Sequence, residues 1–141
     1  MTETNENPLA YQVGGSHYKK YKYQPIEFFN DVRLDFNRAN AIKYLVRWRQ
    51  KNGVEDLRKA VQYLRFAEQE QYKRIRLEVR FVKQFGIEKE GEIIDQILDM
   101  CVIEAREAIE DLIDIEEAKA QAEETPDADA NFFEENETRK Q

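Results

Sequence analysis

Two short blocks in the N-terminal part of this chain combine residue types that bind anions. In the first block, Gly14 and Gly15 precede His17 and Lys19, so backbone N–H groups and side chains can point at the same ligand. In the second, Lys43 and Arg47 are one helical turn apart, which places two cations on one face, and Lys51 extends the row. The blocks together predict a phosphate site with catalytic roles for His17, Lys43 and Arg47.

Further residues around these blocks have types suited to holding the rest of a substrate. Aromatic side chains beside cations offer a flat surface on which a base can stack while the cations hold phosphate. A carboxylate near a cationic pocket can accept a ribose or base hydrogen bond, or hold a metal. The expected substrate-binding residues are Gly14, Gly15, Ser16, Tyr18, Lys19, Asn40, Tyr44, Trp48, Asn52, Asp56 and Lys59.

Each of these assignments has a structural alternative. A row of cations on a helix is usually a solvated face, a lone histidine such as His17 is usually a hydrogen-bonded structural residue, and Trp48 is more often core. Asn52 and Glu55 are expected to cap a helix, and Asp56 with Lys59 can form a simple surface pair.

Several kinds of site are excluded or disfavoured. The chain has no Gly-x-x-x-x-Gly-Lys-Ser/Thr motif, which excludes a P-loop. Cys101 and His17 are each the only residue of their type, which excludes an intrachain zinc site and a disulfide. Carboxylates at helical spacing can hold magnesium in all-α nucleotide pyrophosphohydrolases, but a solvated acidic face is the simpler explanation here, so no metal site is predicted. These carboxylates are Glu92, Asp95, Asp99, Glu104 and Glu107.

Composition favours a single all-α domain, because 36% of the 141 residues are charged and only five are Gly and three Pro. We expect an ordered loop from Val13, then a short helix that Pro25 opens and that turns Ile26, Phe28 and Phe29 to the core. A helix capped by Asp35 or Asn37 should run to about Gln50. Gly53, in a left-handed conformation, should then end it and begin a helical hairpin.

The second arm of the hairpin is predicted as a long helix to about Gln84, with a candidate break at 68–71. From Glu90 a C-terminal helix has apolar residues at a 3.5-residue repeat, which indicates close packing either within the chain or in a homo-oligomer. The repeat is formed by Ile94, Leu98, Cys101, Ala105, Ala108, Leu112 and Ile115. The expected organisation is a flexible N-terminus (1–12), a helical domain (13–119) and a disordered acidic tail (120–141).

Charge divides the chain into opposite halves. Residues 1–80 carry 16 Lys and Arg against 10 Asp and Glu, whereas residues 81–141 carry 6 against 19. The division fits either a nucleic-acid surface with a competing acidic tail or, as we favour, a basic ligand pocket in a soluble assembly. Phe132 and Phe133 can dock a host-protein partner or pack on their own domain. No segment has the length and apolarity of a membrane span or signal peptide, so a cytoplasmic protein is expected.

The order of the motifs resembles the SaV-like phage protein family, whose members include the early deoxynucleoside monophosphate kinase of T-odd coliphages. The resemblance spans roughly residues 12–66, with 67–119 left as helices for packing or oligomerisation. Two departures are Ala39, where the family often has Gly, and Val46, where an aromatic residue is common; Ala39 bears on substrate choice. The matching strings are Gly14-Gly15-Ser16-His17-Tyr18-Lys19, Gln24-Pro25-Ile26-Glu27-Phe28, Asn40-Ala41-Ile42-Lys43-Tyr44-Leu45-Val46-Arg47-Trp48 and Lys51-Asn52-Gly53-Val54-Glu55-Asp56-Leu57-Arg58-Lys59-Ala60.

The resemblance implies phosphoryl transfer from ATP or another nucleoside triphosphate to a deoxynucleoside monophosphate of the dGMP or dTMP type, in the cytoplasm of a host cell. The magnesium requirement stays open. Arg47 would hold phosphate oxygens, Lys43 and Lys19 would neutralise charge, and His17 would hydrogen-bond a phosphate, with Tyr18 or Trp48 stacked on a base. The alternatives are a non-catalytic nucleotide-binding protein that sequesters a nucleotide signal or inhibits a host enzyme, and a nucleic-acid binder.

Overall fold

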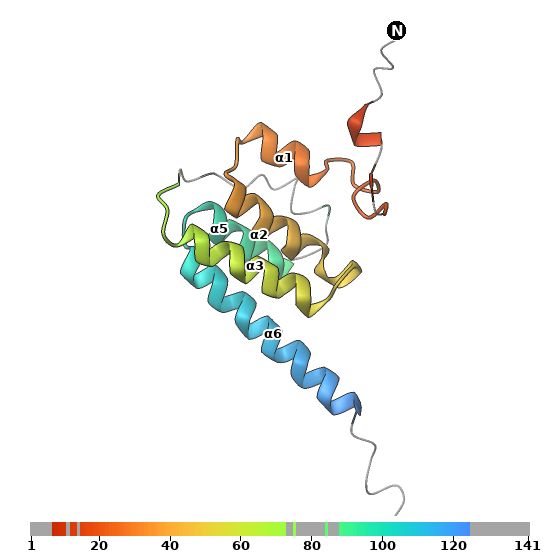
Figure 1. The fold of residues 1–141 in the computed structure, drawn as a ribbon, viewed down its shortest axis with the longest axis vertical. Helices are drawn as coiled ribbons and strands as arrows, with labels where there is room; N and C mark the ends of the chain where they lie inside the picture. Colours follow the sequence, from red (N-terminus) through yellow and green to blue (C-terminus); the bar gives the residue numbers. More distant parts are fainter. Residues whose placement is uncertain are drawn as a thin grey trace, which may run out of the picture.

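The computed structural model describes residues 7–10, 12–13, 15–72, 75, 84 and 88–124, and these contain helices and no strand (Figure 1). The all-α prediction is therefore confirmed. The α-helices are α1 (Pro25–Asp31), α2 (Phe36–Arg47), α3 (Val54–Ala67), α5 (Glu88–Leu98) and α6 (Val102–Glu124), with short 3-10 turns at Pro8–Ala10 (η1) and Trp48–Gln50 (η2).

The starts of α1 and α2 follow from their sequences. Pro25 occupies the first turn of α1, where its missing N–H costs nothing, and Glu27 Oε2 accepts a hydrogen bond from Gln24 N at 2.7 Å. At α2, Asp35 is the N-cap, and its Oδ1 accepts from Arg38 N at 2.9 Å. Both helix starts confirm the sequence-based predictions.

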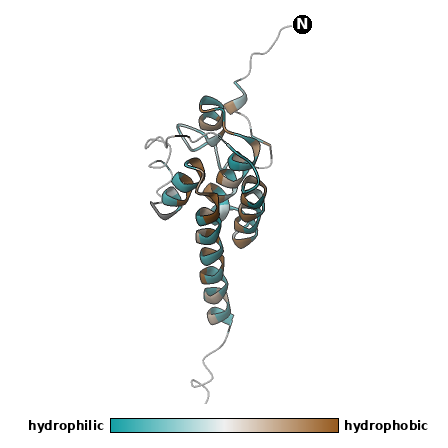
Figure 2. Cartoon of the chain, turned by 90° about the vertical axis from the view of Figure 1, so that its left-hand side faces the viewer, coloured by the Kyte–Doolittle hydropathy of each residue, from teal (hydrophilic) through white to brown (hydrophobic). Residues whose placement is uncertain are grey.

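The core lies among α2, α3, α5 and α6. Helices α2 and α3 form the predicted hairpin, α6 packs along α3, and α5 contacts both α6 and α2 (Figure 1). Helix α6 extends beyond the other helices, and its final turns are largely hydrophilic (Figure 2). The apolar side chains with no exposed surface include Phe28, Ile42, Leu45, Leu57, Leu64, Ile94, Ile97, Leu98 and Ile109.

The long-helix predictions need correction. Helix α3 ends at Ala67, just before the candidate break at 68–71, and the described residues 68–72 and 75 are not helical, so the break is present. Most of the predicted continuation to Gln84 lies outside the described residues. The predicted helix from Glu90 is two helices, because Met100 adopts φ +68° between them. A positive φ cannot be accommodated in a right-handed helix.

The apolar residues of the 3.5-residue repeat lie on both sides of this break, and most of them are buried within the chain. Leu98 on α5 and Ala105 and Leu112 on α6 are at most 3% exposed, and α6 contacts α3 and α5. Intrachain packing therefore accounts for most of the repeat, and only Ile115, 43% exposed, faces outward. Self-association through α6 stays a prediction.

Two other features differ from expectation, the exposure of one side chain of α1 and the end of α6. Ile26 is 49% exposed, while Phe28 and Phe29 are buried as predicted. Helix α6 runs to Glu124, so the tail boundary at 120 was wrong; residues 125–141, with Phe132 and Phe133, lie outside the described residues. Within the described segments, no helix combines the length and apolarity needed to cross a bilayer.

Candidate functional site

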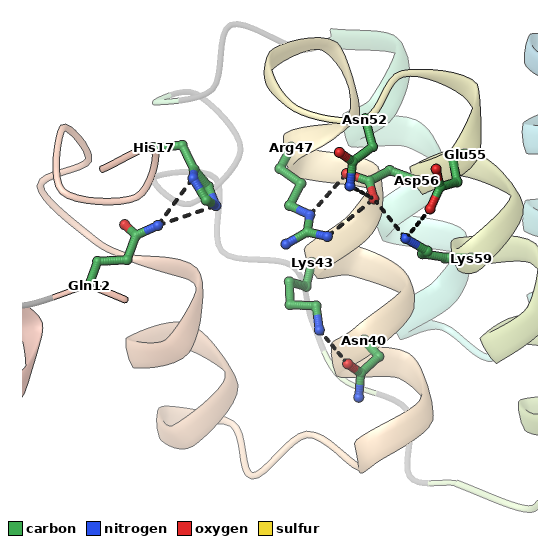
Figure 3. Close-up of polar contacts among 9 residues, drawn as sticks. All are labelled: Gln12, His17, Asn40, Lys43, Arg47, Asn52, Glu55, Asp56 and Lys59. Atoms are coloured by element: carbon green, nitrogen blue, oxygen red, sulfur yellow. Dashed lines mark hydrogen bonds and ion pairs between the residues drawn. The ribbon is translucent and has the colours of Figure 1, made fainter. Parts of the chain in front are cut away.

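The cation row forms on α2 as its helical spacing predicts. Lys43 and Arg47 project from one face of the helix, and the His17 ring lies on the same side of α2, carried by the loop that precedes α1 (Figure 3). Arg47 and Lys51 both act on the ionisation of His17, which places the loop within electrostatic range of the row. The structure thus brings two sequence-distant blocks to one side of the molecule.

A buried carboxylate fixes the orientation of Arg47. Asp56 has no exposed surface, and its Oδ2 and Oδ1 accept from Arg47 Nε and Nη2 at 3.0 and 3.1 Å. Asn52 Nδ2 donates to the same Oδ1 at 3.1 Å (Figure 3). Burial opposes the charge on Arg47, but Asp56 and Tyr18 outweigh it and raise the pKa of Arg47. Asp56 is therefore a positioning residue for Arg47, and α2 is tied to α3 through it.

Lys43 is half-buried and held by a neighbour on its own helix. Its Nζ donates to Asn40 Oδ1 at 2.6 Å (Figure 3). Burial lowers the pKa of Lys43, and the nearby Arg47 lowers it further, while Asp56 acts in the opposite direction. Because these effects disfavour the charged form, an anion bound beside Lys43 would act in the opposite direction and raise the pKa of Lys43.

Three cations surround the ring of Tyr44. Lys43 Nζ, Arg47 Cζ and Lys59 Nζ lie 4.4, 4.6 and 5.7 Å from its centroid. The ring also stacks on Tyr63, with centroids 5.9 Å apart. Tyr44 therefore organises cations instead of offering the open stacking face that the sequence suggested.

The start of α3 corrects the capping prediction. Gly53 is the N-cap, with φ +55° and ψ −134°. The positive φ agrees with prediction, but this ψ lies outside the left-handed helical region and is open to glycine because it lacks Cβ. Asn52 donates to Asp56 instead of capping, and Glu55 Oε1 lies 2.5 Å from Lys59 Nζ, which is also 3.9 Å from Asp56 Oδ1.

The loop that carries His17 is ordered by a glutamine. Gln12 Nε2 lies 3.1 Å from His17 Nδ1, and Gln12 Oε1 accepts from Tyr18 N at 3.1 Å. Gly15 has φ +138°, and a Cβ there would lie 3.2 Å from His17 Nδ1, so a side chain would strain the backbone and crowd the ring. Ser16 and Lys19 are exposed on this loop, and Gly14 lies outside the described residues.

Burial lowers the pKa of His17, and the cations Lys51, Arg47 and Lys20 lower it further, while Asp56 opposes them. The imidazole is therefore neutral at pH 7 and can donate one hydrogen bond. Burial also raises the pKa of the Tyr18 hydroxyl, with Arg47 acting against the rise. That buried hydroxyl has no hydrogen bond of normal geometry within the described chain, so a polar ligand atom would satisfy it.

Trp48 does not belong to this site. It is 4% exposed, and its Nε1 donates to Glu90 Oε1 at 3.1 Å; Glu90 also accepts from Arg49 Nε at 2.9 Å. Arg49 Cζ lies 4.2 Å from the indole centroid. The base-stacking role predicted for Trp48 is corrected accordingly: the residue joins the end of α2 to α5 in the core.

A pocket of about 440 Å³ opens between α1, α2 and the His17 loop. Sequence reasoning missed most of its wall, because the residues come from separate segments and include apolar side chains that a helical pattern assigns to the core. The signal that the sequence did offer was an aromatic residue, Phe36, one helical turn before Asn40 in the same row. The lining residues are Tyr18, Ile26, Phe29, Asn30, Leu34, Phe36, Ala39, Asn40 and Lys43.

The acidic residues of the C-terminal half stay apart from this site. Glu92, Asp95, Asp99, Glu104 and Glu107 are all exposed. Across the described ranges, no three His, Cys, Asp or Glu side chains come together in a way that suits a metal ion. The carboxylate that contacts the cation row, Asp56, is engaged by Arg47 and Asn52.

A family model described as a protein of unknown function (DUF3310) matches residues 12–65. The match takes in the His17 loop, α1, α2 and nearly all of α3, so the cation row, Asp56 and the whole pocket lining fall inside it. Helices α5 and α6 lie outside the match. No curated protein and no solved structure matches the chain.

Proposed function

We propose that this protein is a nucleotide kinase that transfers a phosphoryl group from ATP or another nucleoside triphosphate to a deoxynucleoside monophosphate without a P-loop. The observation that supports it most is the joining of a nucleotide-sized pocket to a cation row, with Lys43 belonging to both. The reaction itself rests on the resemblance of residues 12–66 to the SaV-like family.

In this proposal the side chains mainly align phosphates and offset their charge, as phosphoryl transfer requires. Arg47 is held by Asp56 through Nε and Nη2, which leaves Nη1 outside this pair and able to donate to a phosphate oxygen. Lys43 Nζ donates to a phosphate oxygen, either in place of its hydrogen bond to Asn40 Oδ1 or in addition to it. His17 and the Tyr18 hydroxyl supply neutral hydrogen bonds from the facing loop.

The test is a coupled turnover assay of the full chain with ATP and magnesium across dGMP, dTMP, dAMP and dCMP, run beside calorimetric binding of each monophosphate. Formation of a diphosphate with at least one of them is expected. Binding without turnover would overturn the kinase and identify the non-catalytic nucleotide binder. Absence of both would remove the nucleotide site altogether.

The pH dependence of phosphate binding tests the role of His17. Because burial and nearby cations lower its pKa in the free protein, a bound phosphate should raise that pKa again, so binding takes up a proton. The affinity of the protein relative to that of His17→Gln should therefore rise as the pH falls from neutral into the acid range in which the imidazole of the bound protein takes up its proton. Phosphate's own second pKa, about 6, affects both proteins alike and cancels in this ratio. Calorimetry with deoxyribose 5-phosphate measures both affinities across the pH range. A ratio of affinities that does not depend on pH would exclude a contact between His17 and the phosphate.

A further inference from the structure

We propose that the pocket between α1 and α2 holds the base of a nucleoside monophosphate, with Phe36 as the stacking residue and Ala39 as the wall that limits base size. This inference rests on the proposed function, because it assumes that the 5′ phosphate lies at Lys43 and Arg47. It assigns base recognition to residues outside the cation row.

The walls of the pocket suit a flat, largely apolar group. Ile26 and Phe29 of α1 face Phe36 and Ala39 of α2, with Leu34 between the helices. Phe36 is 72% exposed, which is unusual for phenylalanine, and it is oriented by an edge-on contact with Tyr63 at 5.8 Å between centroids. An aromatic ring held in place yet open to solvent provides a stacking surface for a base.

The order of residues along α2 fixes the direction of the ligand. Phe36, Asn40, Lys43 and Arg47 follow a spacing of four, three and four, which places them in one row on the helix surface. Seven residues separate Phe36 from Lys43, a rise of about 10 Å. That rise allows a base to stack at one end while its 5′ phosphate meets the cations at the other.

One polar group on the opposite wall is available to the base edge. Asn30 of α1 lines the pocket, and its carboxamide makes no hydrogen bond within the part of the chain that the structure describes. Asn40, in contrast, is engaged at both ends, donating to Phe36 O and accepting from Lys43. A free carboxamide offers one acceptor and two donors, which suits the mixed edge of a base.

The experiment compares two ligands that share the phosphate and differ in the base. Calorimetry with a deoxynucleoside monophosphate, dGMP as a purine and dTMP as a pyrimidine, and with deoxyribose 5-phosphate is run on the full chain and on Phe36→Ala, Ala39→Leu, Lys43→Met and Phe66→Ala. Phe66 is the matched control, since it is also exposed (52%) and also contacts Tyr63 but lies outside the pocket. Circular dichroism and thermal melts verify that each variant is folded.

Phe36→Ala is expected to weaken nucleotide binding about tenfold and to leave deoxyribose 5-phosphate binding unchanged. Ala39→Leu, which fills the wall, should weaken purine nucleotides more than pyrimidine nucleotides, and Phe66→Ala should change neither ligand. Equal losses for both ligands, or equal effects of Phe36→Ala and Phe66→Ala, would overturn the base pocket while leaving the phosphate site intact. If nucleotide binding needs Phe36 but not Lys43, the proposed function fails instead.

Discussion

Replacing Lys43 by methionine should lower the rate of phosphoryl transfer by about 100-fold or more. Methionine keeps the unbranched apolar stem and removes only the ammonium group, which in this structure stands where the apolar pocket meets Arg47. Loss of one group that stabilises charge in a transition state typically costs about 10²–10³ in rate. Turnover with the best monophosphate, measured at saturating ATP, gives the ratio directly.

The control for this change is Lys119→Met on α6, a residue 63% exposed and, among the described residues, paired only with the local Glu116 Oε1 at 2.8 Å. Its turnover should equal that of the unmodified protein. Lys43 should tolerate substitution without unfolding, because it is half-exposed and its one side-chain hydrogen bond within the part of the chain that the structure describes is to Asn40. A folded Lys43→Met protein with full activity would remove Lys43 from the reaction.

Arg47→Met should destabilise the fold by about 3–5 kcal/mol, because it leaves the fully buried Asp56 without its cation. Asn52 donates to the carboxylate at 3.1 Å and Lys59 lies 3.9 Å away, but neither provides the two parallel hydrogen bonds of the guanidinium. Urea unfolding followed by circular dichroism measures the difference in free energy of unfolding.

Two further variants distinguish the cost of breaking the buried Arg47–Asp56 pair from the cost of removing an arginine side chain at any position. Arg58→Met removes a pair with Glu117 whose side chains are 59% and 43% exposed, so its cost should stay below about 1 kcal/mol. Adding Asp56→Asn to Arg47→Met removes the stranded charge and should recover part of the lost stability. If Arg47→Met and Arg58→Met cost the same, the Arg47–Asp56 pair does not have the structural role assigned to it.

Local chemistry made the helix starts predictable. Pro25 suits a first helical turn and Asp35 carries a short side chain that reaches Arg38 N, so the starts of α1 and α2 were identified from residue type alone. At α3 the residue type indicated only the positive φ of Gly53, because the N-cap is Gly53 and not the predicted Asn52. The helix ends were less predictable. Met100 takes φ +68° although nothing in its residue type favours it, and apolar spacing continues across the break.

The candidate site was predictable in its charges and not in its surfaces. Helical spacing placed Lys43 and Arg47 on one face, but it could not distinguish a tryptophan packed on Glu90 from one open to a ligand. Burial of Trp48 depends on α5, which begins about 40 residues later in the chain. The role of Asp56 was also not predictable from helical spacing, because it depends on α3 packing against α2, which brings Asp56 to Arg47.

By itself, then, the sequence determined that the chain is helical, where α1 and α2 begin, and which cations share a face, because all three depend on interactions within a few residues. Tertiary structure alone decided that Asp56 orients Arg47, that Trp48 is core, and that Phe36, Ala39 and Asn30 enclose a pocket. Those outcomes depend on which helices meet, and that is set by the burial of side chains from the whole chain.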